Sequence, residues 1–253
     1  MNIDLSGKVA LVTGATGQLG RVMTRTLAQC GAKVAIHYMN NAAKAEELLQ
    51  EITTLGSAGV IVQGDITKQD SIERMKQQIC AELGEPDIVV ANAVVQYEWA
   101  SVLEQSPDDY LSQFESCVMQ NVYLAKAFIP AMVAKRAGRF IGINTESAMQ
   151  NFPGQSAYTA GKRGMDGVYR VLAKEVGEYQ ITVNQVAPGW TISEKDRNTG
   201  DLNDASYVEQ VPLKRRGEDQ DIANAVAFLA SDLASYITGA YIPVNGGNVM
   251  PAI

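Results

Sequence analysis

The segment Lys8–Gly20, KVALVTGATGQLG, constrains this chain most, because it joins an apolar strand to a turn with three glycines spaced three positions apart. Val9 to Thr13 predict the strand, and a helix is predicted to begin near Gln18. Glycine lets the backbone turn sharply and lets a pyrophosphate approach peptide N–H groups, and a helix N-terminus favours such an anion. The segment therefore predicts a dinucleotide-binding unit, with a purely structural glycine turn as the alternative.

Apolar runs alternate with segments of helical apolar spacing along the rest of the chain. Strands are predicted over 33–38, 60–63, 87–91, 139–145, 181–187 and 240–244, and helices over 41–55, 70–83, 106–136, 156–178 and 219–230. This alternation is typical of right-handed βαβ units and of a parallel sheet covered on both faces. At 253 residues, without a linker, repeat or low-complexity tract, the chain is expected to form one α/β domain.

The polar stretch 190–217 has few periodic apolar positions. It predicts a long loop with a short helix, a composition typical of a mobile lid over a substrate site.

Composition argues against several classes of function. The formal net charge of −7 disfavours non-specific binding to nucleic acid or to an anionic membrane. We identify no segment long and apolar enough to span a bilayer and no signal-peptide pattern, so a cytoplasmic protein is expected. The isolated cysteines Cys30, Cys80 and Cys117 predict reduced thiols. With His37 as the single histidine, neither a metal site nor a Ser-His-Asp triad has its parts.

Tyr158 and Lys162 lie four positions apart on the helix predicted over 156–178, so their side chains share one face. A tyrosine has an ordinary pKa of about 10, and a nearby ammonium group would lower it toward the working range of a proton donor. The pair alone is typical of a surface contact. Together with the glycine turn it indicates a catalytic pair.

Six motifs in this order resemble the short-chain dehydrogenase/reductase family nearly end to end. They are TGATGQLG (13–20), Asp65-Ile66, ANA (91–93), YTAGK (158–162), NQVAPG (184–189) and ITGAYIPVNGG (237–247). The last segments, with IANAVAFLASD (222–232), look most like 3-oxoacyl-carrier-protein reductases. The resemblance implies a Rossmann fold in which residues 1–253 form a single NAD(P)-binding domain, a doubly wound parallel sheet of about seven strands with helices on both faces.

The resemblance also implies roles for individual residues. Tyr158 would be the general acid in reduction, Lys162 would hold the nicotinamide ribose, and Thr145 would replace the family's serine thirteen positions before the tyrosine, with Ser147 as the fallback. No metal is implied. The residues implied to bind the cofactor are Gly14, Thr16, Gly17, Gln18, Leu19, Gly20, Tyr38, Asp65, Ile66, Asn92, Lys162, Pro188, Gly189 and Thr191.

The chain departs from the family pattern at several positions. Cys117 stands where a catalytic asparagine normally lies, and a thiol cannot copy an amide. Asn121, one turn further on, is a hypothetical substitute, with an ordinary polar helix residue as the alternative. Beside the cofactor, the usual Asn-Asn-Ala-Gly is 91–94, Ala-Asn-Ala-Val, and Gln18 stands where shorter members carry the middle glycine.

Cofactor choice depends on the end of the second predicted strand. An acid there would accept from both ribose hydroxyls and repel a 2′-phosphate. Tyr38 occupies that position, no acid follows in 39–41, and Lys44 is the nearby cation, so NADP(H) is favoured over NAD(H). Segments that would line the substrate pocket carry aromatic and apolar residues that suggest an apolar or planar substrate, with a place in the core or in an interface as the alternative for each: Tyr97, Trp99, Met149, Phe152 and Trp190.

The sequence thus predicts an NAD(P)-dependent oxidoreductase that transfers hydride between the cofactor and a carbonyl or secondary alcohol, including 3-oxoacyl thioesters as a substrate class. The alternative is a catalytically weak cofactor-binding module with a regulatory or interaction role, suggested by Cys117 and by the changes at 91–94. The family resemblance implies a homo-oligomer, a tetramer or dimer, acting on a small molecule with neither nucleic acid nor membrane as a partner.

Overall fold

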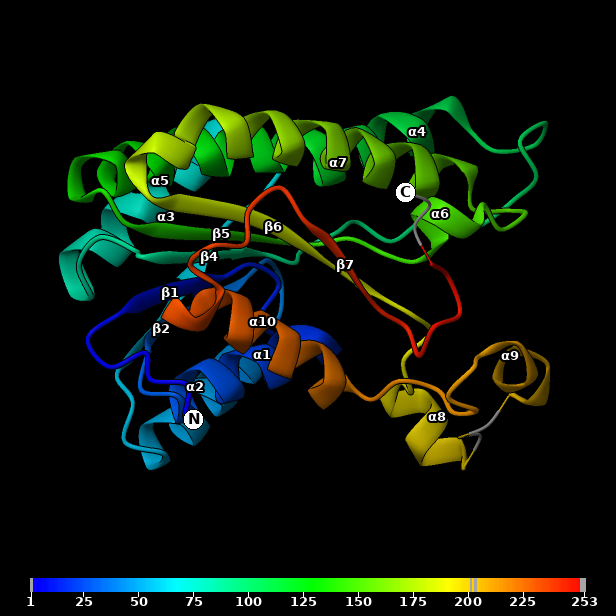
Figure 1. The fold of residues 1–253 in the computed structure, drawn as a ribbon, viewed down its shortest axis with the longest axis horizontal. Coiled ribbons are helices and arrows are strands. Elements are labelled where there is room, and N and C mark those ends of the chain that lie inside the picture. Colours follow the sequence, from blue (N-terminus) through cyan, green and yellow to red (C-terminus); the bar gives the residue numbers. More distant parts are fainter. Residues whose placement is uncertain (1, 201, 203, 251–253) are drawn as a thin grey trace.

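The computed structural model describes residues 2–200, 202 and 204–250. Within these residues seven strands form one parallel sheet in the order β3-β2-β1-β4-β5-β6-β7 (Figure 1). The strands are β1 (Val9–Val12), β2 (Lys33–Tyr38), β3 (Gly59–Gln63), β4 (Ile88–Ala91), β5 (Gly138–Ile143), β6 (Ile181–Pro188) and β7 (Tyr241–Val244). The doubly wound α/β fold expected from the sequence is confirmed.

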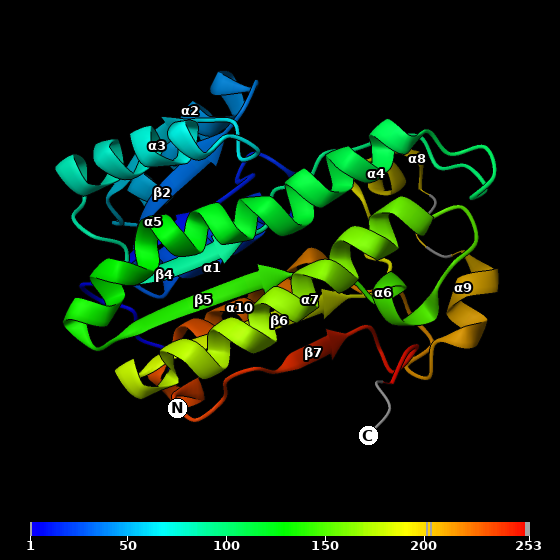
Figure 2. The same cartoon turned by 90° about the horizontal axis from the view of Figure 1, so that it is seen from above.

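Helices cover both faces of this sheet, as Figures 1 and 2 show from two directions. One face carries α1 (Gln18–Gln29), α2 (Ala42–Thr54) and α10 (Asp219–Ala230), and the other carries α3 (Gln69–Glu82), α5 (Gln120–Lys135) and α7 (Ser156–Val176). Each layer has its own apolar core, with Met23 and Leu48 in the first and Phe128 and Tyr169 in the second. Strands buried on both faces explain the continuous apolar runs in the sequence.

The sheet reverses its winding direction at β1. Val12 pairs with Ile36 of β2 on one side and with Val90 of β4 on the other. The strands β2 and β3 therefore lie on one side of β1, and the strands β4 to β7 follow one another on its other side. Ligands of such sheets bind in the crevice where the carboxyl ends of the two central strands diverge.

The helix predicted over 106–136 is continuous but irregular. Ser106 caps α4 (Pro107–Phe114), a π-helical turn follows over Glu115–Met119, and α5 completes the run. By length and composition 107–135 could cross a membrane, which corrects the expectation that no segment could. Half of its most apolar window (50 %) is buried inside the protein, and α5 packs against α3 and α7 as a core helix does.

The stretch 190–217 contains two short helices, where the sequence predicted a loop with one. The first is α8 (Glu194–Thr199), which has a capping box between Ser193 and Asp196, and the second is α9 (Ala205–Gln210), which is capped by Asp204. These caps are readable in the sequence, but helices of one or two turns leave too little apolar periodicity to recognise. The same reason explains why the sequence does not predict α6 (Ser147–Gln150).

Candidate active site

The glycine turn after β1 packs tightly against the start of α1. Gly14 has φ +62°, which favours glycine, and a Cβ added there would lie 3.0 Å from the Cα of Ala93. A Cβ on Gly20 would lie 2.8 Å from the Cα of Ala15, so this glycine lets the helix approach the turn. Gly17, the N-cap of α1, has no side chain and lines the cavity at the N-terminal end of the helix.

A cavity of about 680 Å³ lies at this turn, where β1 and β4 diverge. The unpaired N–H groups at the start of α1 and the positive end of its dipole favour an anion bound next to Gly17. The bare glycine backbone therefore fits the pyrophosphate of a dinucleotide. Eight of the residues implied to bind the cofactor line this cavity, namely Gly14, Thr16, Gly17, Gln18, Leu19, Asp65, Ile66 and Asn92.

His37 is hydrogen-bonded to the backbone of the glycine turn, a role that the sequence did not predict. Its Nδ1 accepts a hydrogen bond from the backbone N–H of Gly14 at 2.8 Å, and its Nε2 lies 3.0 Å from the carbonyl oxygen of Gly64. Burial lowers the pKa of His37 to about 4, so the imidazole is neutral at physiological pH. His37 therefore acts as a structural hydrogen-bond acceptor for the glycine turn.

Asn92 ties the end of β4 to the same turn. Its side-chain amide donates to the carbonyl oxygens of Thr13 at 2.9 Å and Gly14 at 3.2 Å. The Thr13 hydroxyl accepts in return from the backbone N–H groups of Asn92 and Ala93, at 2.9 and 3.0 Å. Asn92, which the family resemblance implies to lie beside the cofactor, thus also fixes the shape of the glycine turn.

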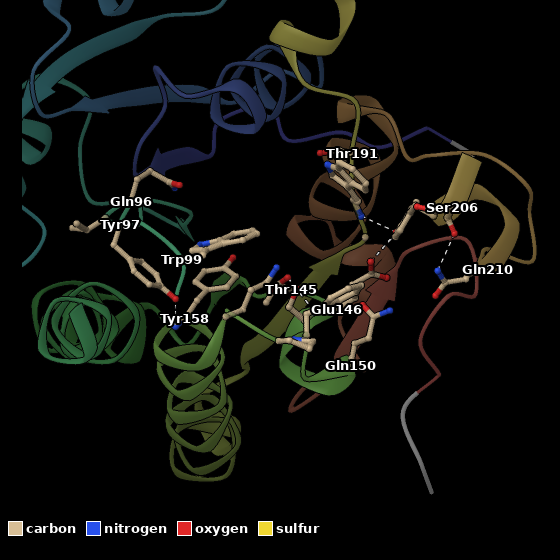
Figure 3. A pocket seen from close by; sticks show the side chains of 18 residues that line it. Gln96, Tyr97, Trp99, Thr145, Glu146, Gln150, Tyr158, Thr191, Ser206 and Gln210 are labelled. Atoms are coloured by element: carbon tan, nitrogen blue, oxygen red, sulfur yellow. Dashed lines mark hydrogen bonds between the residues drawn. The ribbon is translucent and has the colours of Figure 1, made fainter. Parts of the chain in front are cut away.

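A second cavity, of about 610 Å³, shares Val95 and Gln96 with the first. In Figure 3, Thr145 and Tyr158 lie together in its wall, with Tyr97 and Trp99 on one side and Glu146 on the other. Aromatic side chains make up much of the remaining lining: Tyr97, Trp99, Phe152, Trp190 and Tyr207. Met149, predicted on this rim, is not among the lining residues.

Tyr158, Lys162 and Thr145 are brought together as the sequence predicted. The Lys162 Nζ lies 5.7 Å from the centre of the Tyr158 ring and donates to the carbonyl oxygen of Ile143 at 2.5 Å. A hydrogen bond with Thr145 acts to lower the pKa of Tyr158. Gly189 and Thr191, implied to wall the nicotinamide, line the same cavity.

The predicted direction of the Tyr158 pKa is wrong for this structure. Burial raises the pKa of Tyr158 above its ordinary value, and the nearby Cys117 thiol raises it further. Burial also lowers the pKa of Lys162, while the nearby Cys117 acts to raise it. The Lys162 Nζ is directed to the Ile143 carbonyl and not to the phenol, desolvation is the largest cause of the shift, and Tyr158 therefore keeps its proton at neutral pH.

Cys117 lies in the π-helical turn, buried near both Tyr158 and Lys162. The hypothesis that Asn121 replaces the missing amide is not supported by its contacts. Asn121 donates to the carbonyl oxygen of Cys117 at 2.7 Å and accepts from the hydroxyl of Tyr169 at 2.7 Å. Both ends of its amide are therefore used inside the helix layer.

Glu146, directly after Thr145, was not singled out from the sequence, yet it joins the stretch 190–217 to the site. The Tyr207 hydroxyl donates to it at 2.7 Å and accepts from the backbone N–H of Trp190 at 2.8 Å, and Asn248 donates to its other oxygen at 3.2 Å. A Cβ on Gly189 would lie 2.9 Å from the Cα of Asn245 and 2.7 Å from the Tyr207 hydroxyl, so a larger residue there would force the backbone to shift. Glu146 thus holds two aromatic walls of the second cavity.

Four residues implied to bind the cofactor lie outside the lining of both cavities: Gly20, Tyr38, Lys162 and Pro188. Gly20 serves the helix packing described above, and Tyr38 packs against the core beneath α1 and α2. The three residues after Tyr38, at 39–41, line the first cavity in its place. Ser147, the fallback for Thr145, lines the second cavity, and its N–H donates to the Thr145 hydroxyl at 3.2 Å.

Comparison with known proteins gives a consistent result. A family model described as Enoyl-(Acyl carrier protein) reductase matches residues 14–248. The 3-oxoacyl-(acyl-carrier-protein) reductase of Escherichia coli is 40 % identical over 250 residues, with 98 % of this chain and 100 % of the relative covered. The enzyme of the same name from Staphylococcus epidermidis is 36 % identical over 253 residues, with 96 % and 99 % covered.

Two solved structures have the same fold. A promiscuous reductase, LugOII, that catalyses keto-reduction in lugdunomycin biosynthesis matches with a TM-score of 0.89 at 29 % identity, covering 97 % of this chain and 99 % of its own. A doubly substituted short-chain dehydrogenase/reductase from Serratia marcescens matches with a TM-score of 0.87 at 30 % identity, covering 96 % and 98 %. The chain therefore belongs to the short-chain dehydrogenase/reductase family and is an NAD(P)-dependent oxidoreductase of that family.

Proposed function

We propose that this enzyme reduces the keto group of a 3-oxoacyl thioester with NADPH, using Tyr158, Thr145 and Lys162. The observation that carries the proposal is the position of Thr145 and Tyr158 in the wall of a cavity that adjoins the cavity at the glycine turn. The names of the curated relatives, which act on 3-oxoacyl groups, support the substrate class. The alternative of a catalytically weak module is not favoured, because both members of the proton-transfer pair are present.

The residues of the chain divide the chemistry between them. When bound, the nicotinamide cofactor supplies a hydride to the carbonyl carbon. Tyr158, kept protonated by burial, donates its proton to the carbonyl oxygen as negative charge develops there. The Thr145 hydroxyl orients that oxygen and the phenol, and Lys162 lies on the same helix face to hold the cofactor ribose and to replace the proton.

NADP(H) is proposed over NAD(H) on the lining of the first cavity. Met39, Asn40 and Asn41 follow β2 there and carry no carboxylate to repel a 2′-phosphate. Asn41 caps α2 through the backbone N–H of Lys44, so a helix N-terminus and a lysine lie at this corner of the site. The helix dipole and the lysine favour an added phosphate.

The stretch 190–217 contributes to the wall of the second cavity. We propose that 190–217 acts as the substrate lid, because it carries Trp190 and Tyr207 into the cavity wall and is held at Gln18 by a bond to the carbonyl oxygen of Ile192 at 2.6 Å.

We further propose that the protein is a cytoplasmic homo-oligomer, a tetramer or dimer. The free cysteines are consistent with a reducing compartment. The acidic net charge argues against nucleic acid or a membrane as a partner.

The test begins with fluorescence titrations of the purified protein with NADPH and NADH, followed in the same cuvette by an acetoacetyl thioester. Tighter binding of NADPH and its oxidation on addition of the thioester are expected. Saturable NADPH binding would contradict the proposed reductase if neither the thioester nor a panel of ketones oxidised the NADPH and no alcohol of a panel reduced NADP⁺. Equal use of both nucleotides would contradict only the cofactor preference.

A further inference from the structure

Asn144 lies between β5 and Thr145, and its side-chain amide is hydrogen-bonded at both ends. The residue is only 2 % exposed. Its Oδ1 accepts from the backbone N–H of Thr145 at 2.9 Å. Its Nδ2 donates to the backbone carbonyl oxygen of Lys162 at 3.1 Å and to Oε1 of Gln185 at 2.7 Å. Because a backbone N–H can only donate and a backbone carbonyl can only accept, these partners fix the orientation of the amide.

These bonds join the two elements that carry the proposed reacting groups. Thr145 follows β5, whereas Tyr158 and Lys162 belong to α7, and Figure 3 shows Thr145 and Tyr158 together at the cavity. The Lys162 ammonium also reaches the end of β5, at the carbonyl oxygen of Ile143, but this ammonium is the group proposed to hold the cofactor ribose. The bond from Asn144 goes to the backbone of Lys162, so it does not depend on where that side chain points.

A second connection runs from the Asn144 amide to the next turn of α7. Gln185 of β6 accepts from Asn144 and donates its own Nε2 to Oδ1 of Asp166 at 2.8 Å. Arg170 in turn donates to both oxygens of the Asp166 carboxylate, at 3.0 and 2.8 Å. Asn144 is therefore tied to two successive turns of α7, directly at Lys162 and through Gln185 at Asp166.

The backbone of Thr145 is held on both sides by side chains. Its N–H donates to Asn144, and its carbonyl oxygen accepts from the hydroxyl of Tyr241 in β7 at 2.5 Å. A threonine is β-branched and stiff at χ1, so its hydroxyl follows the position of the backbone more closely than a serine hydroxyl does. A shift of the Thr145 backbone would therefore move the hydroxyl that is hydrogen-bonded with Tyr158.

We propose that Asn144 is a positioning residue of the reaction, which keeps the Thr145 hydroxyl aligned with the Tyr158 hydroxyl by tying the end of β5 to the backbone of α7. The inference rests on the roles of Thr145 and Tyr158 proposed above and applies to whichever carbonyl compound the enzyme reduces. Asn144 does not line either cavity, so it acts through Thr145 rather than on a ligand. A displacement of about 1 Å at a reacting group can cost about 10²-fold in rate.

Single-turnover oxidation of NADPH by the acetoacetyl thioester, or by the ketone that is reduced fastest, measures the chemical step apart from binding and product release. Asn144→Ala should lower this rate by about tenfold to hundredfold, while the KM values for NADPH and for the carbonyl compound change by less than about threefold. If Asn144→Ala does not fold, Asn144→Ser serves in the same comparison, because one hydroxyl cannot serve all three partners of the amide.

Asn184→Ala is the matched control for loss of a buried asparagine. Asn184 lies in the neighbouring strand β6, and its amide donates to the carbonyl oxygen of Ile237 at 2.6 Å and accepts from the N–H of Ala240 at 3.1 Å. These partners precede β7 and do not involve the reacting groups. The control should lower the urea midpoint of unfolding, as Asn144→Ala does, but should leave the single-turnover rate unchanged.

The decisive measurement repeats Asn144→Ala in a Thr145→Ser background. If Asn144 acts by holding the backbone beneath a stiff side chain, the more freely rotating serine hydroxyl recovers part of the alignment, and Asn144→Ala should then cost only about threefold in rate. An asparagine that only stabilises the fold would cost the same factor in both backgrounds, because its contribution to stability does not depend on the rotamer at position 145.

The outcomes separate this inference from the proposed reductase. An equal loss of rate in both backgrounds, or an unchanged rate in the Asn144 variants, would overturn the inference and leave the reductase in place. Full turnover by Thr145→Val, or no oxidation of NADPH by the parent with any carbonyl compound, would refute the proposed chemistry and the inference together.

Discussion

The hydroxyl of Tyr97 accepts a hydrogen bond from the backbone N–H of Tyr158 at 2.9 Å, across 61 positions of the chain. This N–H belongs to the first turn of α7, where no intrahelical partner is available. The residue before α7, Gln155, makes no side-chain cap. Tyr97 therefore caps the first turn of the helix that carries Tyr158, the proposed proton donor.

Tyr97→Phe should lower kcat by about threefold to tenfold, because the first turn of α7 loses about 1 kcal/mol and Tyr158 loses its fixed position. Steady-state kinetics and thermal unfolding measure the two effects. Tyr236→Phe is the control, since Tyr236 is fully exposed. An unchanged kcat together with an unchanged Tm would show that this bond positions nothing.

Tyr158→Phe should abolish most turnover, by a factor of about 10²–10⁴, because it removes the proton donor from the reacting oxygen. NADPH affinity should stay within about twofold, since the phenol is not needed to hold the nucleotide. Lys162→Met should weaken both turnover and cofactor binding. Kinetics and NADPH titration check all three values, and full activity of the Phe variant would refute the assignment.

Stability should decrease with acidification through His37. Folding favours its neutral form, so this contribution is fully present above pH 6.5 and is lost as the pH falls toward the folded-state pKa of about 4. The difference corresponds to about 3 kcal/mol. Urea unfolding at several pH values would measure it.

His37→Asn keeps an oxygen to accept from Gly14 N but does not titrate. The variant should be less stable at neutral pH, because the contact with Gly64 is lost, and its stability should change less between pH 6.5 and 4 than that of the parent. Parallel pH profiles for the two proteins would mean that His37 does not carry this dependence.

Asn121→Ala should destabilise the protein by roughly 2–3 kcal/mol, because the buried carbonyl of Cys117 and the hydroxyl of Tyr169 each lose a partner. The kcat should remain within about threefold of the parent. Denaturant unfolding and kinetics separate the two effects, with exposed Asn224→Ala as the control. Loss of turnover without loss of stability would instead place Asn121 in a proton relay.

Asn40→Asp should shift the enzyme away from NADPH. The substitution adds a negative charge to the cavity lining without changing side-chain size, and a 2′-phosphate is repelled while a ribose hydroxyl is not. The kcat/KM for NADPH should fall by about tenfold or more while that for NADH changes little. Asn224→Asp makes the same change at an exposed position of α10, and an identical response there would point to net charge instead.

Local rules were enough to predict the fold and the shared helix face of Tyr158 and Lys162. The glycine spacing of 14–20 is set by sterics within a few residues, and the alternation of strands and helices follows from apolar periodicity. Tyr158 and Lys162 share a face because a helix places residues four apart together. These rules did not predict the π-helical turn within 107–135 or the two short helices of 190–217, because such short elements leave almost no periodic signal in the sequence.

Tertiary structure decided what the site residues do. Burial, which depends on segments far apart in the chain, reversed the predicted direction of the Tyr158 pKa and made His37 a neutral acceptor beneath Gly14. Packing likewise used both ends of the Asn121 amide, because the Cys117 carbonyl and the Tyr169 hydroxyl lie beside it. A sequence names the groups available for catalysis, but desolvation and hydrogen-bond partners arise only when distant segments meet, and these determine which groups are charged and which are hydrogen-bonded.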